Sequence, residues 1–142
     1  MKIYFVFLPI TFLFLFACSK EDVKLEAFSP EAFAYDLGES WEVNATINVK
    51  GFNQKDNAQS NTYTASISYS VDLLTPEGKK IEDIFSDVIN KTNNEKITDL
   101  QLEVQFELDS TYSLGKYKLF FHIKDNFTNK KVDSSVEFDL TE

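Results

Sequence analysis

The sequence contains no arginine, one cysteine and one histidine, and each scarcity argues against a class of function. All 14 basic residues are lysines, they stand against 23 acidic residues, and the net charge is −9. Because phosphate backbones are bound by a positive field and by bidentate arginine forks, we expect no nucleic-acid partner. One cysteine cannot form an internal disulfide or a cysteine-rich zinc site. With a single histidine as well, we expect no metal centre and no cofactor.

The longest apolar run lies at the start of the chain. Residues 3–17 are apolar apart from Pro9 and Thr11, and Met1-Lys2 gives the run a positive start. Fifteen helical residues rise about 22 Å, which is less than the roughly 30 Å hydrocarbon core of a bilayer. This length is typical of a secretory signal peptide rather than a spanning helix. Residues 1–17 are therefore predicted to be a signal peptide.

The apolar run ends in Leu15-Phe16-Ala17-Cys18, which resembles a bacterial lipobox. In that motif the cysteine is lipidated and becomes the mature N-terminus, so the resemblance implies a lipid anchor at Cys18. The chain's one cysteine stands where lipidation requires it. Several acyl chains together make a lasting membrane anchor. The alternative is an ordinary signal peptide with Cys18 as a core thiol.

The residues that follow, Ser19, Lys20, Glu21 and Asp22, resemble the surface-export signal of Bacteroidetes lipoproteins. That resemblance implies a surface lipoprotein in the outer leaflet of the outer membrane, facing the medium. The alternative is a solvated tether on a lipoprotein that faces the periplasm. Residues 18–30 are thus expected to be the lipidated cysteine and its tether.

Beyond the tether, apolar and polar residues alternate with the period of two that is typical of half-buried β-strands. The clear alternations cover residues 41–50, 63–73, 100–108, 116–124 and 132–140. The weaker segments are a lead-in strand around residues 25–28 that Pro30 interrupts, turns at 36–40 and 75–78, and loops at 51–61 and 90–95. Residues 79–89 fit either a helix or a strand, and we favour an irregular strand.

These segments predict an all-β domain over residues 31–142, a single antiparallel β-sandwich of about seven strands. The last two strands give its most specific test. If residues 125–130 form the connecting loop, facing residues have numbers that sum to 255. Lys118 then faces Glu137 and His122 faces Asp133 on the outer side, and opposite charges across strands stabilise such a register.

A family resemblance rests on the same hairpin. Leu114-Gly115-Lys116-Tyr117-Lys118-Leu119 is similar to the Gly-x-Tyr-x-Leu strand of bacterial Ig-like domains, and residues 136–140 resemble their closing strand. The resemblance implies an Ig-like or fibronectin-III-like sandwich and no particular activity. The chain departs from the antibody pattern because it lacks an inter-sheet disulfide and carries Trp41 on an early strand.

Candidate chemistry is sparse. His122 is predicted on the outer face opposite Asp133, where a His–Asp pair offers a general base. An exposed sheet face excludes no water, and no serine follows a nucleophile-elbow pattern, so we expect a surface histidine and no enzyme. Asp125, Asn126, Asn129 and Asp133 offer oxygen ligands without the spacing of an EF-hand, and calcium binding stays open.

One surface patch and one modification site complete the candidates. Phe120 lies on a polar face, and with Lys118, His122 and Phe127 it marks a candidate partner patch. Single exposed aromatic residues are also common. Asp109-Ser110-Thr111 resembles the O-glycosylation sequon of Bacteroidetes envelope proteins, with Ser110 as the acceptor.

The function expected from these observations is that of a membrane-anchored, non-catalytic binding or accessory module that docks on an outer-membrane protein complex. Strand edges available for pairing suit such a role. The alternative is a glycan-binding lipoprotein of a nutrient-uptake system. Sugar sites usually present exposed aromatic rings as platforms. Trp41 falls on the inward side of its strand, which argues against this alternative.

Overall fold

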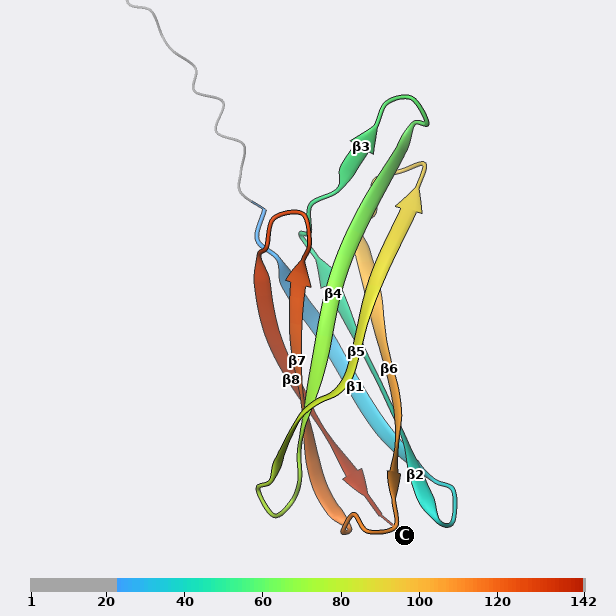
Figure 1. Ribbon diagram of the computed structural model, residues 1–142, viewed down its shortest axis with the longest axis vertical. Helices are drawn as coiled ribbons and strands as arrows, with labels where there is room; N and C mark the ends of the chain where they lie inside the picture. Colours follow the sequence, from blue (N-terminus) through green and yellow to red (C-terminus); the bar gives the residue numbers. More distant parts are fainter. Residues whose placement is uncertain (1–22, 142) are drawn as a thin grey trace, which may run out of the picture.

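The computed structural model describes residues 23–141, which form eight strands in two sheets (Figure 1). In chain order the strands are β1 (Glu26–Asp36), β2 (Ser40–Lys50), β3 (Lys55–Asn57), β4 (Thr62–Leu74), β5 (Lys80–Asn93), β6 (Asp99–Asp109), β7 (Gly115–Asp125) and β8 (Lys131–Leu140). The predicted all-β, antiparallel sandwich is confirmed. The additional strand is β3, which lies within the predicted loop 51–61. The described residues contain no helix of the length and apolarity needed to cross a membrane.

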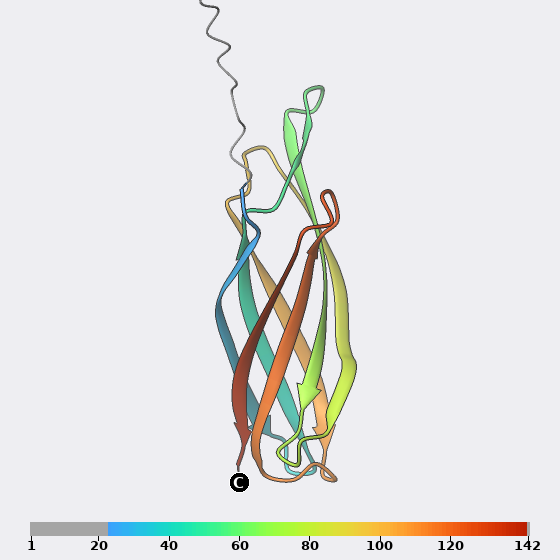
Figure 2. The same cartoon turned by 90° about the vertical axis from the view of Figure 1, so that its left-hand side faces the viewer.

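The strands are divided between two antiparallel sheets. One has the order β1-β2-β6, and the other has the order β5-β4-β7-β8. Strand β3 pairs with the first residues of β4, along the same edge that β7 occupies farther on. The chain crosses between sheets after β2, β5 and β6, so that both sheets enclose one core (Figure 2). Strands β5 and β6 are the outer edges on one side.

Inward side chains of the central strands form the core. They belong to the predicted apolar rows, and each is at most 4% exposed: Val43, Ala45, Ile47 and Val49 of β2, Ile67, Tyr69, Val71 and Leu73 of β4, and Leu119, Phe121 and Ile123 of β7. Burying an aliphatic or aromatic side chain of this size contributes about 1.5–3 kcal/mol. Because the opposite row of each strand is polar, the pleat itself determines which side chains face outward.

The register of the β7–β8 hairpin is confirmed residue by residue. Lys118 lies opposite Glu137, His122 opposite Asp133, and Leu119 opposite Val136. Glu137 forms its ion pair diagonally, with Lys116 Nζ at 3.5 Å, rather than with Lys118 directly opposite.

The folded region begins earlier than predicted. Strand β1 starts at Glu26, whereas the tether was expected to extend to residue 30 and the domain to begin at residue 31. Pro30 interrupts the hydrogen-bond ladder without ending the strand, because the register shifts there and Ser29 has a φ of 51°. A bulge is where a strand accommodates a residue that lacks an N–H group.

Residues 79–89 lie almost entirely in strand β5, as favoured, but the predicted loop at 90–95 is wrong for residues 90–93. Between the pairs at Ile81 and Phe85, β5 holds three residues opposite Asp72 alone, with a φ of 50° at Asp83. The bulge adds two residues, so Ile81, Phe85 and Ile89 all remain on the inward side, opposite Leu73, Val71 and Ile67. The end of β5 is polar because it pairs with β4 at the sandwich rim.

The first described residue lies beside the β7–β8 loop, and we call this end of the sandwich the entry end (Figure 1). Asp125, fully buried there, accepts hydrogen bonds from the Asn53 N–H at 2.8 Å, the Phe127 N–H at 2.9 Å and the Thr128 hydroxyl at 2.8 Å. One carboxylate thereby joins the β2–β3 segment to the β7–β8 loop.

Gly51 lies at the entry end, where it packs closely against the backbone of Lys24. Its φ is +75°, and a Cβ there would lie 2.0 Å from the backbone oxygen of Lys24. Gly38, with a φ of +93° and no atom within 4 Å of its Cβ position, is the matched control. Gly38→Ala should cost about 1 kcal/mol from backbone strain alone. Gly51→Ala should cost at least about 2 kcal/mol more, because backbone atoms must move.

Urea unfolding followed by Trp41 fluorescence measures both variants. Equal midpoints for the two substitutions would contradict the close packing of Lys24 on Gly51.

Candidate functional site

The outer face of the β5-β4-β7-β8 sheet carries an open groove with a volume of about 750 Å³. Its floor consists of small residues, because Ser68 and Ser70 point outward from the central strand β4 and Ser86 lies beside Ser70 on β5. Larger side chains stand around this floor and form the walls: Val88, His122, Lys124, Lys131 and Asp133. The hollow therefore follows from a row of serines in the alternating pattern.

The walls of the groove differ in character. On the β5 side Val88 is 51% exposed, which is unusual for a large aliphatic side chain on this face. On the opposite side Lys124 and Lys131 lie directly across from each other in the β7–β8 register. Neither lysine belongs to an ion pair within the described part of the chain. The groove thus joins an apolar wall, a hydroxyl floor and two cationic side chains.

A buried carboxylate organises one end of the groove. The Asp72 side chain is 6% exposed and contacts Lys80 Nζ at 2.7 Å and His122 Nε2 at 2.9 Å. The bulge in β5 turns the Asp83 N–H toward the same carboxylate, at 2.9 Å. Burial by itself would raise the pKa of Asp72, but these three hydrogen bonds outweigh it and lower the pKa to about 2.

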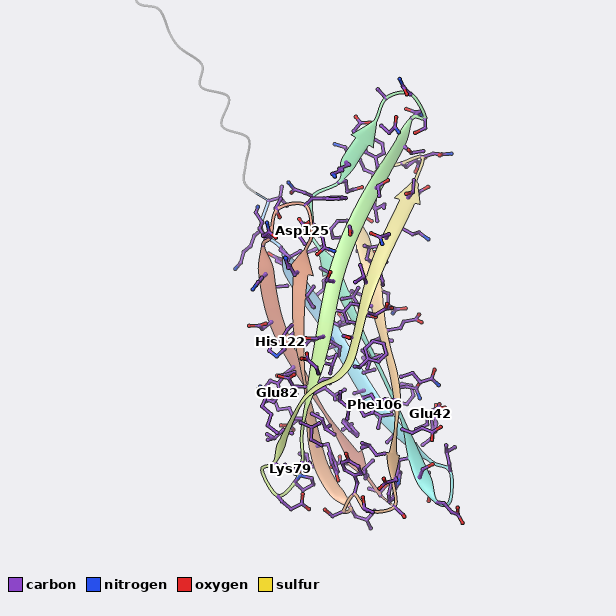
Figure 3. The ribbon with its side chains drawn as sticks, viewed as in Figure 1. Glu42, Lys79, Glu82, Phe106, His122 and Asp125 are labelled. Carbon is purple, nitrogen blue, oxygen red and sulfur yellow. The ribbon has the colours of Figure 1, made fainter. Side chains whose placement is uncertain are left out.

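His122 bridges two carboxylates, with its Nε2 on Asp72 and its Nδ1 on Asp133, both at 2.9 Å (Figure 3 labels His122). Ionised carboxylates only accept hydrogen bonds, so the protonated imidazole, whose two ring nitrogens both donate, satisfies both contacts. The hydrogen bond to Asp133, followed by that to Asp72, raises the pKa of His122. A doubly donating imidazolium has no lone pair for a general base. The expected cross-strand pairing of His122 with Asp133 is present, and the two carboxylates hold the imidazole ring in place at the edge of the groove.

The structure separates the predicted partner patch into two parts. Lys118, Phe120 and His122 lie along β7, where Phe120 is partly buried and Lys118 Nζ lies 5.3 Å from its ring centroid. Phe127 lies beyond the end of β7 in the β7–β8 loop, with Lys55 Nζ 4.5 Å from its ring centroid. Of these four residues, His122 alone lines the groove.

The oxygen ligands considered for calcium do not converge. Asp125 points into the protein and receives the three hydrogen bonds described above. Asn126 bonds Ser66 and Ser68, and Asp133 bonds His122. Within residues 23–141, no three histidine, cysteine or acidic side chains are grouped so that they could hold a metal ion.

The remaining predicted residues lie outside the groove. Ser110 is exposed in the turn after β6, where the N–H and hydroxyl of Thr111 both bond Asp109. The lipidation residue Cys18 and the export residues Ser19, Lys20, Glu21 and Asp22 fall outside the described residues.

Sequence reasoning missed Asp72, Lys80 and the serine floor. The alternation of residues 63–73 already placed Ser68, Ser70 and Asp72 on the outer face, and a run of small outward residues is the signal that predicts a hollow. The contact between Lys80 and Asp72 could not be predicted from the sequence, because it depends on the bulge in β5.

A second exposed surface lies on the outer side of the β1-β2-β6 sheet. Phe33 and Tyr35 of β1 are 44% and 57% exposed, with ring centroids 5.2 Å apart in an edge-to-face arrangement. Asn44 of β2 lies opposite Phe33, and Gln105 of β6 lies opposite Asn44. The face therefore places aromatic rings beside a row of amides.

No protein-family model and no curated protein matches the sequence. Among solved structures, the X-ray structure of a Northeast Structural Genomics Consortium target is 12% identical, with a TM-score of 0.42 over 82% of this chain and 85% of that chain. β-Glucosidase 3B from Thermotoga neapolitana in complex with glycerol is 15% identical, with a TM-score of 0.34 over 84% of this chain and 16% of that chain. Similarities this distant carry no functional argument.

The charge network predicts how stability depends on pH. The folded pKa of Asp72 is lowered from 3.8 to about 2, so the unfolded chain takes up its proton first. The stability that Asp72 contributes is complete above about pH 4 and should be lost toward pH 2, a loss of about 2 kcal/mol. The raised pKa of His122 acts in the opposite direction. Its contribution is complete below its ordinary value near 6.5 and should be lost as the pH rises through the raised value.

Urea unfolding at a series of pH values measures both limbs. Asp72→Asn should remove the acid limb, and His122→Gln the alkaline limb. Asp133→Asn is the matched control for the acid limb, because its side chain is 76% exposed. An acid limb that is unchanged in Asp72→Asn would contradict the assignment.

Proposed function

We propose that the protein is a lipid-anchored lipoprotein of the outer membrane, displayed on the cell surface, that acts as a non-catalytic binding or accessory module. It docks on an outer-membrane protein through the groove on the β5-β4-β7-β8 sheet. The single observation that carries the docking role is this groove, a hollow with an exposed Val88 on one side and with Lys124 and the His122 ring on the other.

The chemistry of the groove supports binding rather than catalysis. The ring nitrogens of its one histidine both lie 2.9 Å from carboxylate oxygens, so neither nitrogen is directed at Ser70 or Ser86 as a base. The groove is also open to water, whereas catalysis by buried electrostatics needs a water-excluded site. The exposed Val88, together with Lys124, which forms no ion pair among the described residues, suits a partner that presents an acidic side chain beside an apolar one.

The strand order supports the Ig-like resemblance. Ig-type sandwiches distribute consecutive strands over two sheets by crossing connections, as the chain does after β2, β5 and β6. Such sandwiches hold binding surfaces on a rigid frame, and the frame alone assigns no activity.

A glycan-binding lipoprotein of a nutrient-uptake system is the second candidate. The exposed Phe33 and Tyr35 beside Asn44 and Gln105 favour it. Aromatic rings offer an apolar face and amides offer paired donors and acceptors, which together suit sugar hydroxyls on a carbon ring.

The anchor is tested by Cys18→Ala. Metabolic labelling with a fatty acid should mark the wild-type protein and leave the variant unlabelled, because Cys18 supplies the only thiol. Equal labelling of both proteins would contradict lipidation at this position.

Protease access on intact cells decides the side of the membrane, and protection until lysis would contradict surface display.

Docking is tested by affinity isolation from gently solubilised outer membranes, followed by mass spectrometry. The wild-type protein should recover a stoichiometric outer-membrane protein, and Ser70→Tyr, which fills the groove, should lower that recovery at least about tenfold. Thr46→Tyr is the matched control, because Thr46 points outward from the central strand of the other sheet. Recovery by Ser70→Tyr equal to that by Thr46→Tyr would contradict docking at the groove.

Saturable binding to a glycan array that Tyr35→Ala abolishes would favour the second candidate.

A further inference from the structure

We propose that the docking partner supplies an extended segment, which pairs with the outer edge of β5 along residues 85–92 as an additional antiparallel strand. The inference rests on the proposed docking role and deepens it, because it specifies the backbone conformation and the side-chain pattern of the partner. The added strand lies beside Val88, on the β5 side of the groove.

Among the described strands, β5 presents the most accessible edge. Strands β1 and β8 contact each other and close one side of the sandwich. On the other side, the Tyr69 hydroxyl donates to the Glu103 carbonyl of β6 at 2.6 Å. Just before β6, the Gln54 side-chain amide forms two hydrogen bonds of 2.8 Å with the backbone of Ile97. Within residues 23–141, β5 pairs with β4 alone, and its other edge lies at the margin of the sandwich (Figure 2).

Hydrogen bonding in β4 determines which backbone groups of β5 face outward. The Asn126 N–H donates to the Ser66 carbonyl, so Ser66 directs its backbone groups toward β7. Because this direction alternates along a strand, Ser68 and Ser70 also face β7, and the residues between them bond β5. The β5 residues opposite these serines therefore direct their N–H and C=O groups to the outer edge: Ser86, Val88 and Asn90.

Val88 supports this direction independently. Its N–H donates to the carboxylate of the neighbouring Asp87 at 2.7 Å, and both residues are exposed. The carboxylate thereby occupies the place that a carbonyl oxygen of an added strand takes. When the strand pairs, the carboxylate is released and is able to bind a cation.

The shape of this edge admits an extended backbone. Above the bulge at Asp83, the pairs of β5 with β4 continue without a shift from Phe85 to Asn93. The outward side chains of Ser86 and Asn90 are short, so they leave the backbone accessible. Unpaired N–H and C=O groups that recur at every second residue match another extended strand, and this is how strand addition gives affinity.

The side chains of the edge specify the pattern of the partner. Phe85 and Ile89 lie on the inward row of β5 and are only partly buried, and Asp87 lies between them on the same row. A strand with two apolar residues and a lysine or arginine between them covers both side chains and pairs with the carboxylate.

The charge of this edge favours a basic partner over a second copy of the chain. Glu82, Asp83 and Asp87 are exposed on β5. Lys91 is the one lysine between residues 81 and 95. Two copies paired edge to edge would add the acids of both at one boundary, whereas a basic strand neutralises them.

Hydrogen exchange with a synthetic probe tests the inference. The probe is the acetylated and amidated peptide Thr-Ile-Val-Lys-Thr-Ile-Lys, which places its first lysine opposite Asp87 and its isoleucines opposite Ile89 and Phe85. It is added to the purified full-length protein, and NMR follows the Ser86 and Asn90 N–H groups. Their exchange should slow at least about tenfold at saturation, because they become paired. Replacing both lysines of the probe by glutamate should weaken binding at least about tenfold.

N-methylated probes separate strand pairing from other modes of binding. A methyl group on the valine nitrogen removes an N–H that faces β5 and should abolish binding. A methyl group on the neighbouring lysine nitrogen lies on the far edge and should leave the affinity unchanged within about twofold. Equal binding of the two methylated probes would overturn the inference, as would failure of the parent probe to bind at about 1 mM.

Two proline variants locate the contact on β5. The Asn90 N–H does not bond β4, so Asn90→Pro leaves the β4–β5 ladder intact and blocks an added strand. Gln105→Pro is the matched control on β6, because Gln105 follows Glu103 by two residues and also directs its N–H outward. Probe binding should be lost in Asn90→Pro and retained in Gln105→Pro, with a cooperative urea transition establishing that each variant is folded. Equal binding by the two variants would contradict pairing at β5.

Affinity isolation from outer membranes separates this inference from the proposed docking role. If Asn90→Pro recovers the partner as well as Gln105→Pro does while Ser70→Tyr loses it, the partner docks at the groove without adding a strand, and the inference is overturned. If the wild-type protein recovers no stoichiometric partner, the docking role is contradicted, while probe binding still decides the inference. Sedimentation of the purified protein as a dimer that Asn90→Pro dissociates would assign the edge to a second copy and overturn the inference.

Discussion

The entry end depends on one buried carboxylate. Asp125 has no exposed surface and accepts hydrogen bonds from Asn53 on one segment and from Phe127 and Thr128 on another. Burying a charge is costly unless every oxygen is satisfied, so these segments must meet where they do. The β7–β8 loop, the crossing from β2 toward β3 and the position of Lys130 are all determined by this contact. The β7–β8 register follows from the same loop.

The groove has a different origin, because it arises from side-chain size. Serines on β4 and β5 leave space that larger residues would fill, and His122 is held at its edge by two carboxylates. Asp72 is the buried member of that network and compensates the loss of its hydration with three donors. The polar network fixes side-chain positions, which is the property that a recognition surface needs.

Most of the sandwich could be predicted from the sequence because alternation encodes it directly. The pairing of Lys118 with Glu137 and of His122 with Asp133 followed from the loop length and the charge pattern. The failures occurred at a bulge and at a polar strand end. A bulge at Ser29 lets β1 pass Pro30, and residues 90–93 of β5 pair regularly with β4 although they are polar. A second bulge lies at Asp83. The approach of Lys80 to Asp72 depends on the second bulge, and a single sequence contains no signal for such a contact.

The two edge strands have a consequence for how copies of the chain coexist. Strands β5 and β6 border the same side of the sandwich, and most of their exposed charges are acids: Glu82, Asp83, Asp87, Asp99, Glu103, Glu107 and Asp109. Open strand edges template the pairing of neighbouring molecules unless charge prevents it. Two such edges repel each other within a Debye length of about 8–10 Å. The acidic side chains along these two strands therefore disfavour edge-to-edge pairing between copies of the chain.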